Sequence, residues 1–540
     1  MITITCMGAA GTVTGSNYLI EDSRGKKILV DCGLFQGGKQ TEWRNGADWG
    51  YDPGEINTLL LTHAHIDHSG RIPKLVKDGF QGKIISSPPT AELCEIMLLD
   101  SGHVQEMEAE WQTRKNRRKG NKKSLQALYT LQDAEASLRY LSPVEGDRII
   151  DIEPGMRARF RNAGHILGSS IIELWVEDGG VEVKIVFSGD IGKNKQLIVK
   201  EPHVIEDADY LFIESTYGNR LHRSFEDSEA ELLDAIEYAA SNNEKVIIPA
   251  FAVERTQEIL YILGEFQRNG TLPDIPIYLD SPLAINATKI FRKNKKYYDE
   301  EATAIVRQGF DPFDMPNLKF TLTTEESIAI NQRQGSAIII AGSGMCTAGR
   351  IKHHLKHNLW RPGASIVIVG FQAMGTTGRR IVDGEKRVRI FGEDVAVAAK
   401  VCTIGGFSAH ADQKGLLEWA GHFAESQPRV FVTHGEPTAS ETLVEKLKED
   451  LNLEAYVPRM RESLILEPKQ VTHAMAREEM EREEMEREDL DQMVRANVAT
   501  IEQELEELKR RLARGDKEVS EVDIDRLRYI EEEFRMVLPE

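Results

Sequence analysis

Residues 58–73 of this chain have the sequence TLLLTHAHIDHSGRIP, in which an apolar run ends at a cluster of polar residues. Three histidines and one aspartate fall within six positions: His63, His65, Asp67 and His68. Imidazole nitrogens and carboxylate oxygens are the ligands of zinc sites that keep access to water. Only 14 of the 540 residues are histidines, so a histidine-rich surface loop formed by chance is the weaker interpretation. The stretch predicts a buried strand that leads into a metal-binding loop.

Three other predicted strands end at residues of a type that can bind metals: His165 in AGHILGSS, Asp190 in FSGDIG and His434 in FVTHGE. Five histidines and two aspartates suit two Zn²⁺ ions per chain with one bridging carboxylate. We assign His63, His65 and His165 to the first ion, Asp67, His68 and His434 to the second, and Asp190 to both.

A pair of metals about 3.5–4 Å apart suits in-line displacement at phosphorus, with a water of lowered pKa as the nucleophile. The leaving oxygen needs a proton, which a histidine held by a carboxylate can supply. Glu214 in IESTYG and His410 in GGFSAHAD are the candidates for this pair, and Asp67 completes the expected catalytic set. Taken singly, Glu214 or His410 is more typical of a structural residue, but their positions at strand ends favour the functional interpretation.

The order of predicted elements divides the chain into four segments. Residues 1–217 alternate short strands with turns, and residues 218–396 alternate amphipathic helices with apolar strands that deliver polar loops. Residues 397–468 return to strands of the first kind. Residues 469–540 form a different, helical segment. We therefore expect an α/β fold in which the second segment is inserted into the first and third.

The last segment carries a heptad pattern. Apolar residues recur at spacings of three and four: Val494, Val498, Ile501, Leu505, Leu508 and Leu512. This spacing predicts a coiled-coil helix, and a break at 514–516 predicts a second helix after it. Two interpretations remain equally open: a hairpin through which the chain binds a second copy or another protein, and a packed helix pair without a partner.

Composition indicates a globular protein, with 41% hydrophobic and 29% charged residues. No apolar run approaches the roughly 20 residues that span a bilayer, no signal peptide is evident, and five scattered cysteines form no CxxC pair. We therefore expect a cytoplasmic protein with no membrane partner. The net charge is −20, but residues 471–540 hold 22 acidic and 12 basic side chains, half of that total. The charge therefore does not exclude a nucleic acid.

The stretch TRKNRRKGNKK at 113–123 is the most basic part of the chain and has no acidic residue. Arg114, Arg117 and Arg118 are candidates for contacts with an RNA backbone, where each phosphate contact adds to the salt dependence of binding. A solvated loop beside a helix is an equally good interpretation. No aromatic residue falls within the run, which weakens the case for base stacking.

Several motifs together resemble a known family. HAHIDH, AGH, SGD and THG, in this order, resemble the metallo-β-lactamase fold. ESTYGNR, IPAFAVERTQEIL, AGSGM, FSAHAD and VTHGE resemble its β-CASP branch, which includes bacterial and archaeal ribonucleases and the endonuclease of mRNA 3′-end processing. The resemblance covers about residues 1–468. It implies an αββα sandwich with an inserted α/β β-CASP domain that covers a dinuclear site.

The resemblance also implies roles for single residues. Glu214 lies at the first β-CASP signature motif, His410 at the second and His434 at the third, where histidine is typical of members that act on RNA. The AGSGM loop, with Ser343 and Gly344, is expected to offer backbone N–H groups to a phosphate. A plain turn between a strand and a helix is the alternative for this loop.

These observations predict a zinc-dependent ribonuclease that cleaves single-stranded RNA by a two-metal mechanism. Two other functions remain open. One is a dinuclear zinc hydrolase of a small ester, thioester or lactone, for which the long insertion is larger than needed. The other is a non-catalytic scaffold subunit of an RNA-processing complex, which would not need to keep every metal ligand.

Overall fold

The computed structural model describes residues 2–37, 39–118, 120, 124–370, 372, 375–467 and 470–473. The predicted helical hairpin, with its expected partner surface, therefore lies outside the described residues, as do Lys119, Lys122 and Lys123. Among the described residues, no helix is long and apolar enough to cross a membrane. The five cysteines are free thiols.

The first sheet joins the N-terminal strands to the end of the described chain. It has eight strands, in the order β23 (Gln470–His473), β22 (Ser463–Glu467), β1 (Ile2–Cys6), β2 (Tyr18–Glu21), β3 (Lys27–Val30), β4 (Ile56–Leu60), β5 (Lys83–Ser86) and β6 (Leu141–Pro143). Residues 470–473 were expected in the helical segment. They form β23 instead, because the backbone at Leu464–Glu467 pairs with them in antiparallel register.

The second sheet packs against the first. It has seven strands, in the order β21 (Ala455–Tyr456), β20 (Arg429–Thr433), β11 (Tyr210–Glu214), β10 (Val181–Phe187), β9 (Ser170–Asp178), β8 (Met156–Asn162) and β7 (Ile150–Glu153). Alternate residues of each strand face opposite sides. Tyr210 and Phe212 of β11 therefore join the core between the sheets, whereas Leu211 and Ile213 join the core on the outer face.

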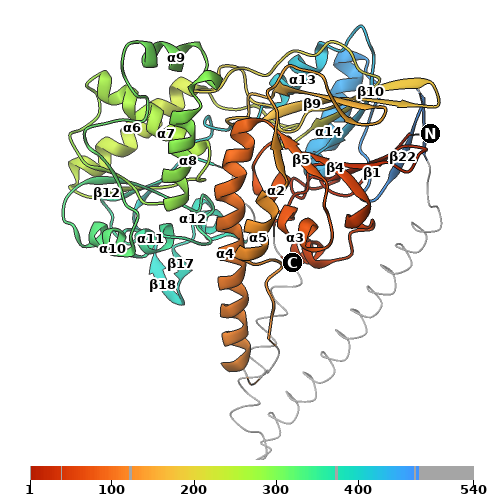
Figure 1. Ribbon diagram of the computed structural model, residues 1–540. Coiled ribbons are helices and arrows are strands. Elements are labelled where there is room, and N and C mark those ends of the chain that lie inside the picture. The colour runs from red at the N-terminus through yellow and green to blue at the C-terminus, as the bar shows by residue number, and fades with distance from the viewer. Residues whose placement is uncertain are drawn as a thin grey trace, which may run out of the picture. The chain divides into compact units, whose positions relative to one another are not determined.

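Helices cover both outer faces of the two sheets, which completes the αββα sandwich (Figure 1). On the first sheet lie α3 (Ile72–Lys77), the start of α4 (Pro88–Arg118) and α5 (Leu131–Leu138). On the second lie α13 (Gln413–Gly421) and α14 (Pro437–Leu451). Two short helices, α1 (Lys39–Glu42) and α2 (Ile66–Ser69), interrupt the loops after β3 and β4.

The third sheet is parallel and has six strands, in the order β14 (Leu318–Phe320), β13 (Ile277–Leu279), β15 (Ala337–Ala341), β12 (Lys245–Pro249), β16 (Ser365–Ile368) and β19 (Lys400–Thr403). Helices pack on both of its faces: α6 (Phe225–Ser241), α7 (Arg255–Arg268), α8 (Pro282–Lys293), α9 (Glu300–Arg307), α10 (Thr324–Gln332), α11 (Ile351–Asn358) and α12 (Thr377–Val382). A hairpin of β17 (Arg387–Ile390) and β18 (Glu393–Ala396) follows α12. Figure 1 shows this part beside the sandwich.

The fold class expected from the sequence is confirmed, but two segments differ. The strand in VCTIGG was expected to return to the sandwich, yet β19 lies in the third sheet because Val367 and Ile368 of β16 pair with Cys402 and Thr403 in parallel. Residues 113–118 are not a loop. They form the last turns of α4.

Candidate metal centre

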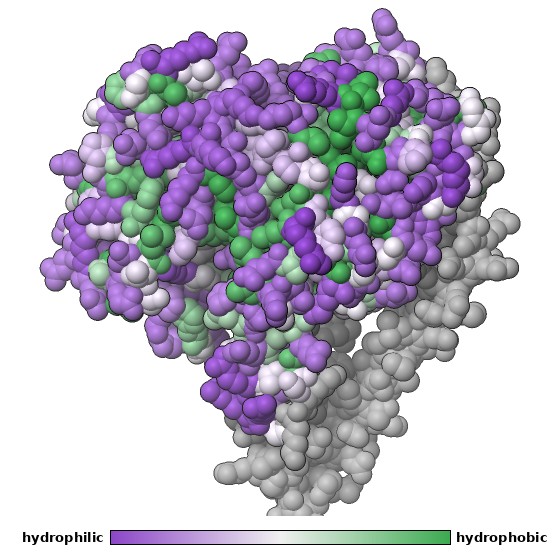
Figure 2. Space-filling view, viewed as in Figure 1, coloured by the Kyte–Doolittle hydropathy of each residue, from purple (hydrophilic) through white to green (hydrophobic). Residues whose placement is uncertain are grey.

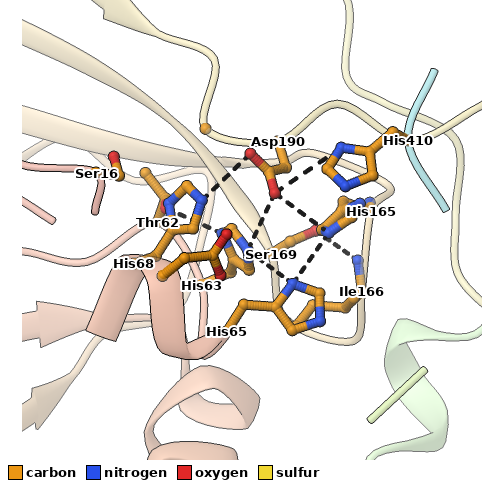
Figure 3. A network of polar contacts seen from close by, with 12 residues as sticks. Ser16, Thr62, His63, His65, His68, His165, Ile166, Ser169, Asp190 and His410 are labelled. Atoms are coloured by element: carbon orange, nitrogen blue, oxygen red, sulfur yellow. Dashed lines mark hydrogen bonds and ion pairs between the residues drawn. The ribbon is translucent and has the colours of Figure 1, made fainter. Parts of the chain in front are cut away.

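The loops that follow the central strands carry the predicted ligands to one edge of the sandwich. His63 and His65 follow β4, and the short helix α2 supplies Asp67 and His68. The loops after β8, β10 and β20 supply the rest: His165, Asp190 and His434. All seven predicted metal ligands therefore meet, although they come from four loops spread over 372 positions. Figure 3 shows imidazole rings from several loops around Asp190.

His63, His65, His165 and Asp190 form the first group of possible ligands. His65 Nδ1 lies 3.1 Å from His63 Nε2 and 3.2 Å from His165 Nε2. Asp190 Oδ2 lies 3.4 Å from both of these Nε2 atoms. Four ligand atoms at about 2.0–2.1 Å from a tetrahedral zinc lie roughly 3.3–3.4 Å from one another. The spacing of this group therefore fits a zinc ion.

Asp67, His68 and His434 form the second group. The two Nε2 atoms of His68 and His434 are 3.2 Å apart, and each lies 3.3 Å from Asp190 Oδ1. Asp67 Oδ2 lies 3.8 Å from His434 Nε2. Asp190 therefore turns one carboxylate oxygen to each group. Its Oδ1 is buried and has no hydrogen-bond donor among the described residues, as expected of an atom placed to bind a cation.

Burial and charge set the protonation of these side chains. Burial holds the pKa of His63 and of His165 well below the usual value, so both imidazoles are neutral and able to bind metal. Burial alone would raise the pKa of Asp190, but the surrounding imidazoles, His68 first, hold it well below its usual range. Burial would lower the pKa of His68, but Asp190 and Asp31 raise it well above its usual value. Without a metal, the buried carboxylate thus lies among both neutral and protonated histidines.

Asp31 orients the second group and was missed by the sequence analysis. Its Oδ2 accepts a hydrogen bond from His68 Nδ1 at 2.7 Å, and its Oδ1 accepts from the Thr62 N–H at 2.9 Å. A ligand histidine commonly donates its other N–H to a carboxylate, which fixes the ring and its tautomer. The available signal was the position of Asp31 in KILVDCG, directly after a strand that neighbours β4.

Glu214 and His410, predicted as a pair, lie in contact beside the first group. His410 Nδ1 is 3.1 Å from each Glu214 carboxylate oxygen and 3.9 Å from Asp190 Oδ2. Glu214 is held in turn by the Ile191 N–H at 2.6 Å. Burial lowers the pKa of His410, but Glu214 and then Asp190 outweigh it and raise that pKa to about 9. His410 is therefore protonated near neutral pH.

Among the described residues, no hydrogen bond or ion pair joins the predicted phosphate- and RNA-binding residues to this cluster. In the AGSGM loop, the Ser343 N–H is directed to the Ala348 carbonyl at 3.3 Å, and Ser343 Oγ accepts from two N–H groups of the same loop. The loop thus uses its Ser343 N–H internally. Arg114, Arg117 and Arg118 are exposed near the end of α4.

The sequence matches three family models in chain order. These are the metallo-β-lactamase superfamily at residues 10–250, the Beta-Casp domain at 256–381 and the Zn-dependent metallo-hydrolase RNA specificity domain at 394–458. The chain is 39% identical to Ribonuclease TTHA0252 of Thermus thermophilus, over 80% of this chain and 93% of the relative. It belongs to the β-CASP family of metallo-β-lactamase-type hydrolases.

Other relatives of this β-CASP protein include archaeal proteins named Transcription termination factor FttA. The one from Methanosarcina mazei is 29% identical over 84% of this chain and 70% of its own length. The one from Thermococcus kodakarensis is 32% identical over 81% of this chain and 67% of its own length.

A buried contact joins the start of α7 (Arg255–Arg268) to the loop that carries His165. Glu254, at the start of α7, accepts a hydrogen bond from the Leu167 N–H at 3.2 Å, two residues after His165. Glu254 is buried and has a φ of 68°, a backbone conformation that side chains other than glycine rarely adopt. The helix therefore holds the loop that carries a predicted ligand.

Proposed function

We propose that this protein is a zinc-dependent ribonuclease that hydrolyses phosphodiester bonds of single-stranded RNA with two zinc ions. The observation that carries the proposal is the position of the Asp190 carboxylate. Its two oxygens each lie 3.3–3.4 Å from the imidazole nitrogens of a different group of predicted ligands. A carboxylate placed in this way suits a pair of cations, and paired cations are typical of enzymes that cleave phosphodiesters.

The seven predicted ligands would hold the zinc pair: His63, His65 and His165 on one side, Asp67, His68 and His434 on the other, and Asp190 between them. The zinc pair would supply Lewis acidity and a water whose pKa is lowered towards 7. Asp190 and Asp67 offset the positive charge of the centre, and Asp31 fixes the ring of His68.

His410 is suited to protonate the leaving oxygen. Because Glu214 holds Nδ1 at 3.1 Å and keeps the imidazole protonated, the ring is oriented and can act as a general acid. Glu214 itself is buried and acts through His410. In this proposal His410 is the proton donor and Glu214 fixes its orientation and charge.

RNA is the substrate that the relatives favour. One relative is named a ribonuclease, and one matched domain is described as an RNA specificity domain. His434 adds a second argument, because histidine at this motif is typical of β-CASP members that act on RNA. The matched RNA specificity domain spans 394–458 and thus includes both His410 and His434.

The test is cleavage of a single-stranded RNA labelled at both ends, with the same sequence as DNA and a small thioester as alternative substrates. Wild type should cleave RNA, whereas His65→Ala and His410→Ala should lose most activity. His357→Ala is the control, because His357 is an exposed histidine on α11 outside the centre. Metal analysis should give two zinc ions in wild type and in the His410→Ala and His357→Ala variants.

Equal RNA cleavage by all four proteins would refute the proposal. Thioester turnover without RNA cleavage would show instead that the centre serves a small substrate. A wild-type protein with well under one zinc per chain, and no activity on adding zinc, would favour a non-catalytic scaffold.

A further inference from the structure

Helix α4 extends far beyond the body of the protein. Its first half is packed, with buried side chains up to Gly102, but none of the side chains described between 103 and 118 is buried. Figure 1 shows the second half projecting below the two domains. A helix end without a fully buried residue gains little stability from packing, so the length of α4 needs another explanation.

The projecting end is strongly basic. Arg114, Lys115, Arg117 and Arg118 are exposed there, and the sequence continues with three more lysines up to residue 123. No acidic residue occurs between 111 and 128, in a chain whose net charge is −20. Figure 2 shows this end as a mainly hydrophilic surface. The four described positive charges, within five residues of one another, repel each other, which favours the binding of a polyanion.

An exposed tryptophan lies beside these charges. Trp111 is 56% exposed, and Lys115 Nζ lies 4.9 Å from the centre of its ring. Trp111 precedes the basic run in the sequence, but residues four apart share a helix face, so the ring and the lysine lie together. Nucleic-acid bases stack on such rings while cations contact the backbone. The structure thus supplies the aromatic residue that the basic run itself lacks.

The two ends of α4 lie at very different distances from the metal centre. Near its start, Thr90 Oγ1 donates to the Gly168 carbonyl at 2.8 Å, in the loop that carries His165. Arg114 lies 24 residues further along, which corresponds to about 36 Å at about 1.5 Å per residue. A stacked strand would need roughly ten nucleotides to span that distance at about 3.4 Å per nucleotide.

We propose that the projecting end of α4 is a second RNA-binding site, at which Trp111 stacks on a base and the surrounding Arg and Lys side chains bind phosphates of a long single strand. The proposal rests on the proposed ribonuclease function. It predicts that the site raises affinity for long RNA and has no effect on RNA too short to reach it.

The test compares two variants with wild type: Trp111→Ala, and the triple variant Arg114→Ala, Arg117→Ala, Arg118→Ala. The control is a triple variant of exposed or half-exposed basic residues elsewhere: Arg333→Ala, Lys446→Ala, Lys448→Ala. Binding of a 30-nucleotide RNA is measured by fluorescence anisotropy at several salt concentrations, in the full chain carrying His410→Ala so that the RNA stays intact. Cleavage of 30- and 5-nucleotide RNAs is measured in the chain that keeps His410.

The triple variant should weaken binding of the long RNA, and the slope of log Kd against log salt should fall by about 2, since each phosphate contact contributes about 0.7. Trp111→Ala should weaken binding roughly ten-fold, the loss of one stacked base. KM for the long RNA should rise, with cleavage of the 5-nucleotide RNA unchanged and the control variant like wild type.

Unchanged affinity and salt slope in both variants would overturn the proposal and indicate that this end of α4 faces a protein instead. Equal losses on short and long RNA would also overturn it, because they would place the effect in the active centre. Failure of the wild type to cleave either RNA would refute the proposed function alone, since the binding measurements still report on this site.

Discussion

Asp190 of the sandwich and Asp280 of the inserted domain are both buried carboxylates. Each lies just after the end of a strand and contacts a histidine. Asp280 follows β13, and each of its oxygens has two donors at 2.6–2.7 Å. The donors are Thr321, Ser327, Arg350 and His354. Asp190 has four imidazoles nearby at 3.3–3.4 Å, and its Oδ1 has no hydrogen-bond donor among the described residues.

This difference is the one we expect between a structural carboxylate and a carboxylate that binds a cation. A buried charge is costly unless it is paired and hydrogen-bonded. The hydrogen bonds that Asp280 can accept are all supplied by the protein. They link the end of β13 to the residues after β14 and to α10 and α11. The Oδ1 atom of Asp190 has no hydrogen-bond donor in the described part of the chain, which is expected of a bridging metal ligand.

The largest effect should come from Asp190→Asn. The amide keeps the shape of the side chain but replaces one oxygen with an NH₂ group that cannot bind a cation. We expect zinc content to fall below two per chain and RNA cleavage to fall about 10³-fold or more, because a catalytic metal supplies several kcal/mol and each 1.36 kcal/mol is about ten-fold in rate. Metal analysis and initial rates measure both.

The same substitution at Asp280 is the matched control. An Asp190→Asn protein that keeps both zinc ions and its activity would remove the distinction drawn between the two carboxylates.

Asp280→Asn should reduce stability instead. Its amide NH₂ would face two donors where an oxygen now accepts, and Arg350 would lose the negative charge that it pairs with at 2.7 Å. Breaking a buried ion pair on one side costs about 3 kcal/mol or more. We expect urea unfolding to shift accordingly, with zinc content unchanged. Loss of zinc without loss of stability would contradict this assignment.

Asp31→Asn tests a residue between these two cases, since Asp31 touches a ligand without facing a metal. Asparagine can still accept from His68 Nδ1, but without the negative charge that increases the basicity of the ring. Zinc affinity should fall about 10- to 100-fold. Competition with a chelator measures it, and Ser16→Ala is a suitable control because Ser16 Oγ donates to the same Asp31 oxygen. An equal loss in both variants would assign the effect to local packing.

All seven residues predicted as ligands converge on the centre, and they could be found in the sequence because each directly or closely follows an apolar strand and several belong to compact motifs. Glu214 and His410 were also paired correctly as neighbours. His165, Asp190 and His434 could be placed together because β8, β10 and β20 run in the same direction in the second sheet, so the loops after them meet at one edge. The histidines after β4 belong to the first sheet and reach the same edge because the two sheets pack together.

The residues that were missed depend on packing between distant segments. Asp280 follows a strand in IPIYLD just as Asp190 does in IVFSGD, and nothing local indicates that Asp280 has four donors from two other helices and a loop. Glu254 contacts Leu167 across 87 positions. The place of β19 in the third sheet was hidden for the same reason, because a short buried strand fits either sheet until its partner is known.

The smallest predicted effect concerns acid. Burial would raise the pKa of Asp280, but hydrogen bonds, that from His354 foremost, hold it well below its usual value of 3.8. A carboxylate with a lowered folded-state pKa adds stability that is fully present well above pH 3.8. This stability begins to be lost as the pH falls past 3.8 and is gone only below the folded-state pKa. The wild type should therefore lose about 0.6 kcal/mol from this group between pH 6 and pH 3.5. Asp280→Asn cannot show that loss, so the stability difference between the two proteins should shrink by that amount.

Urea unfolding of both proteins in metal-free form measures this stability difference, because protonation of the metal ligands then affects both equally. A stability difference that stays constant between the two pH values would show that the charge of Asp280 does not contribute to the stability of the fold.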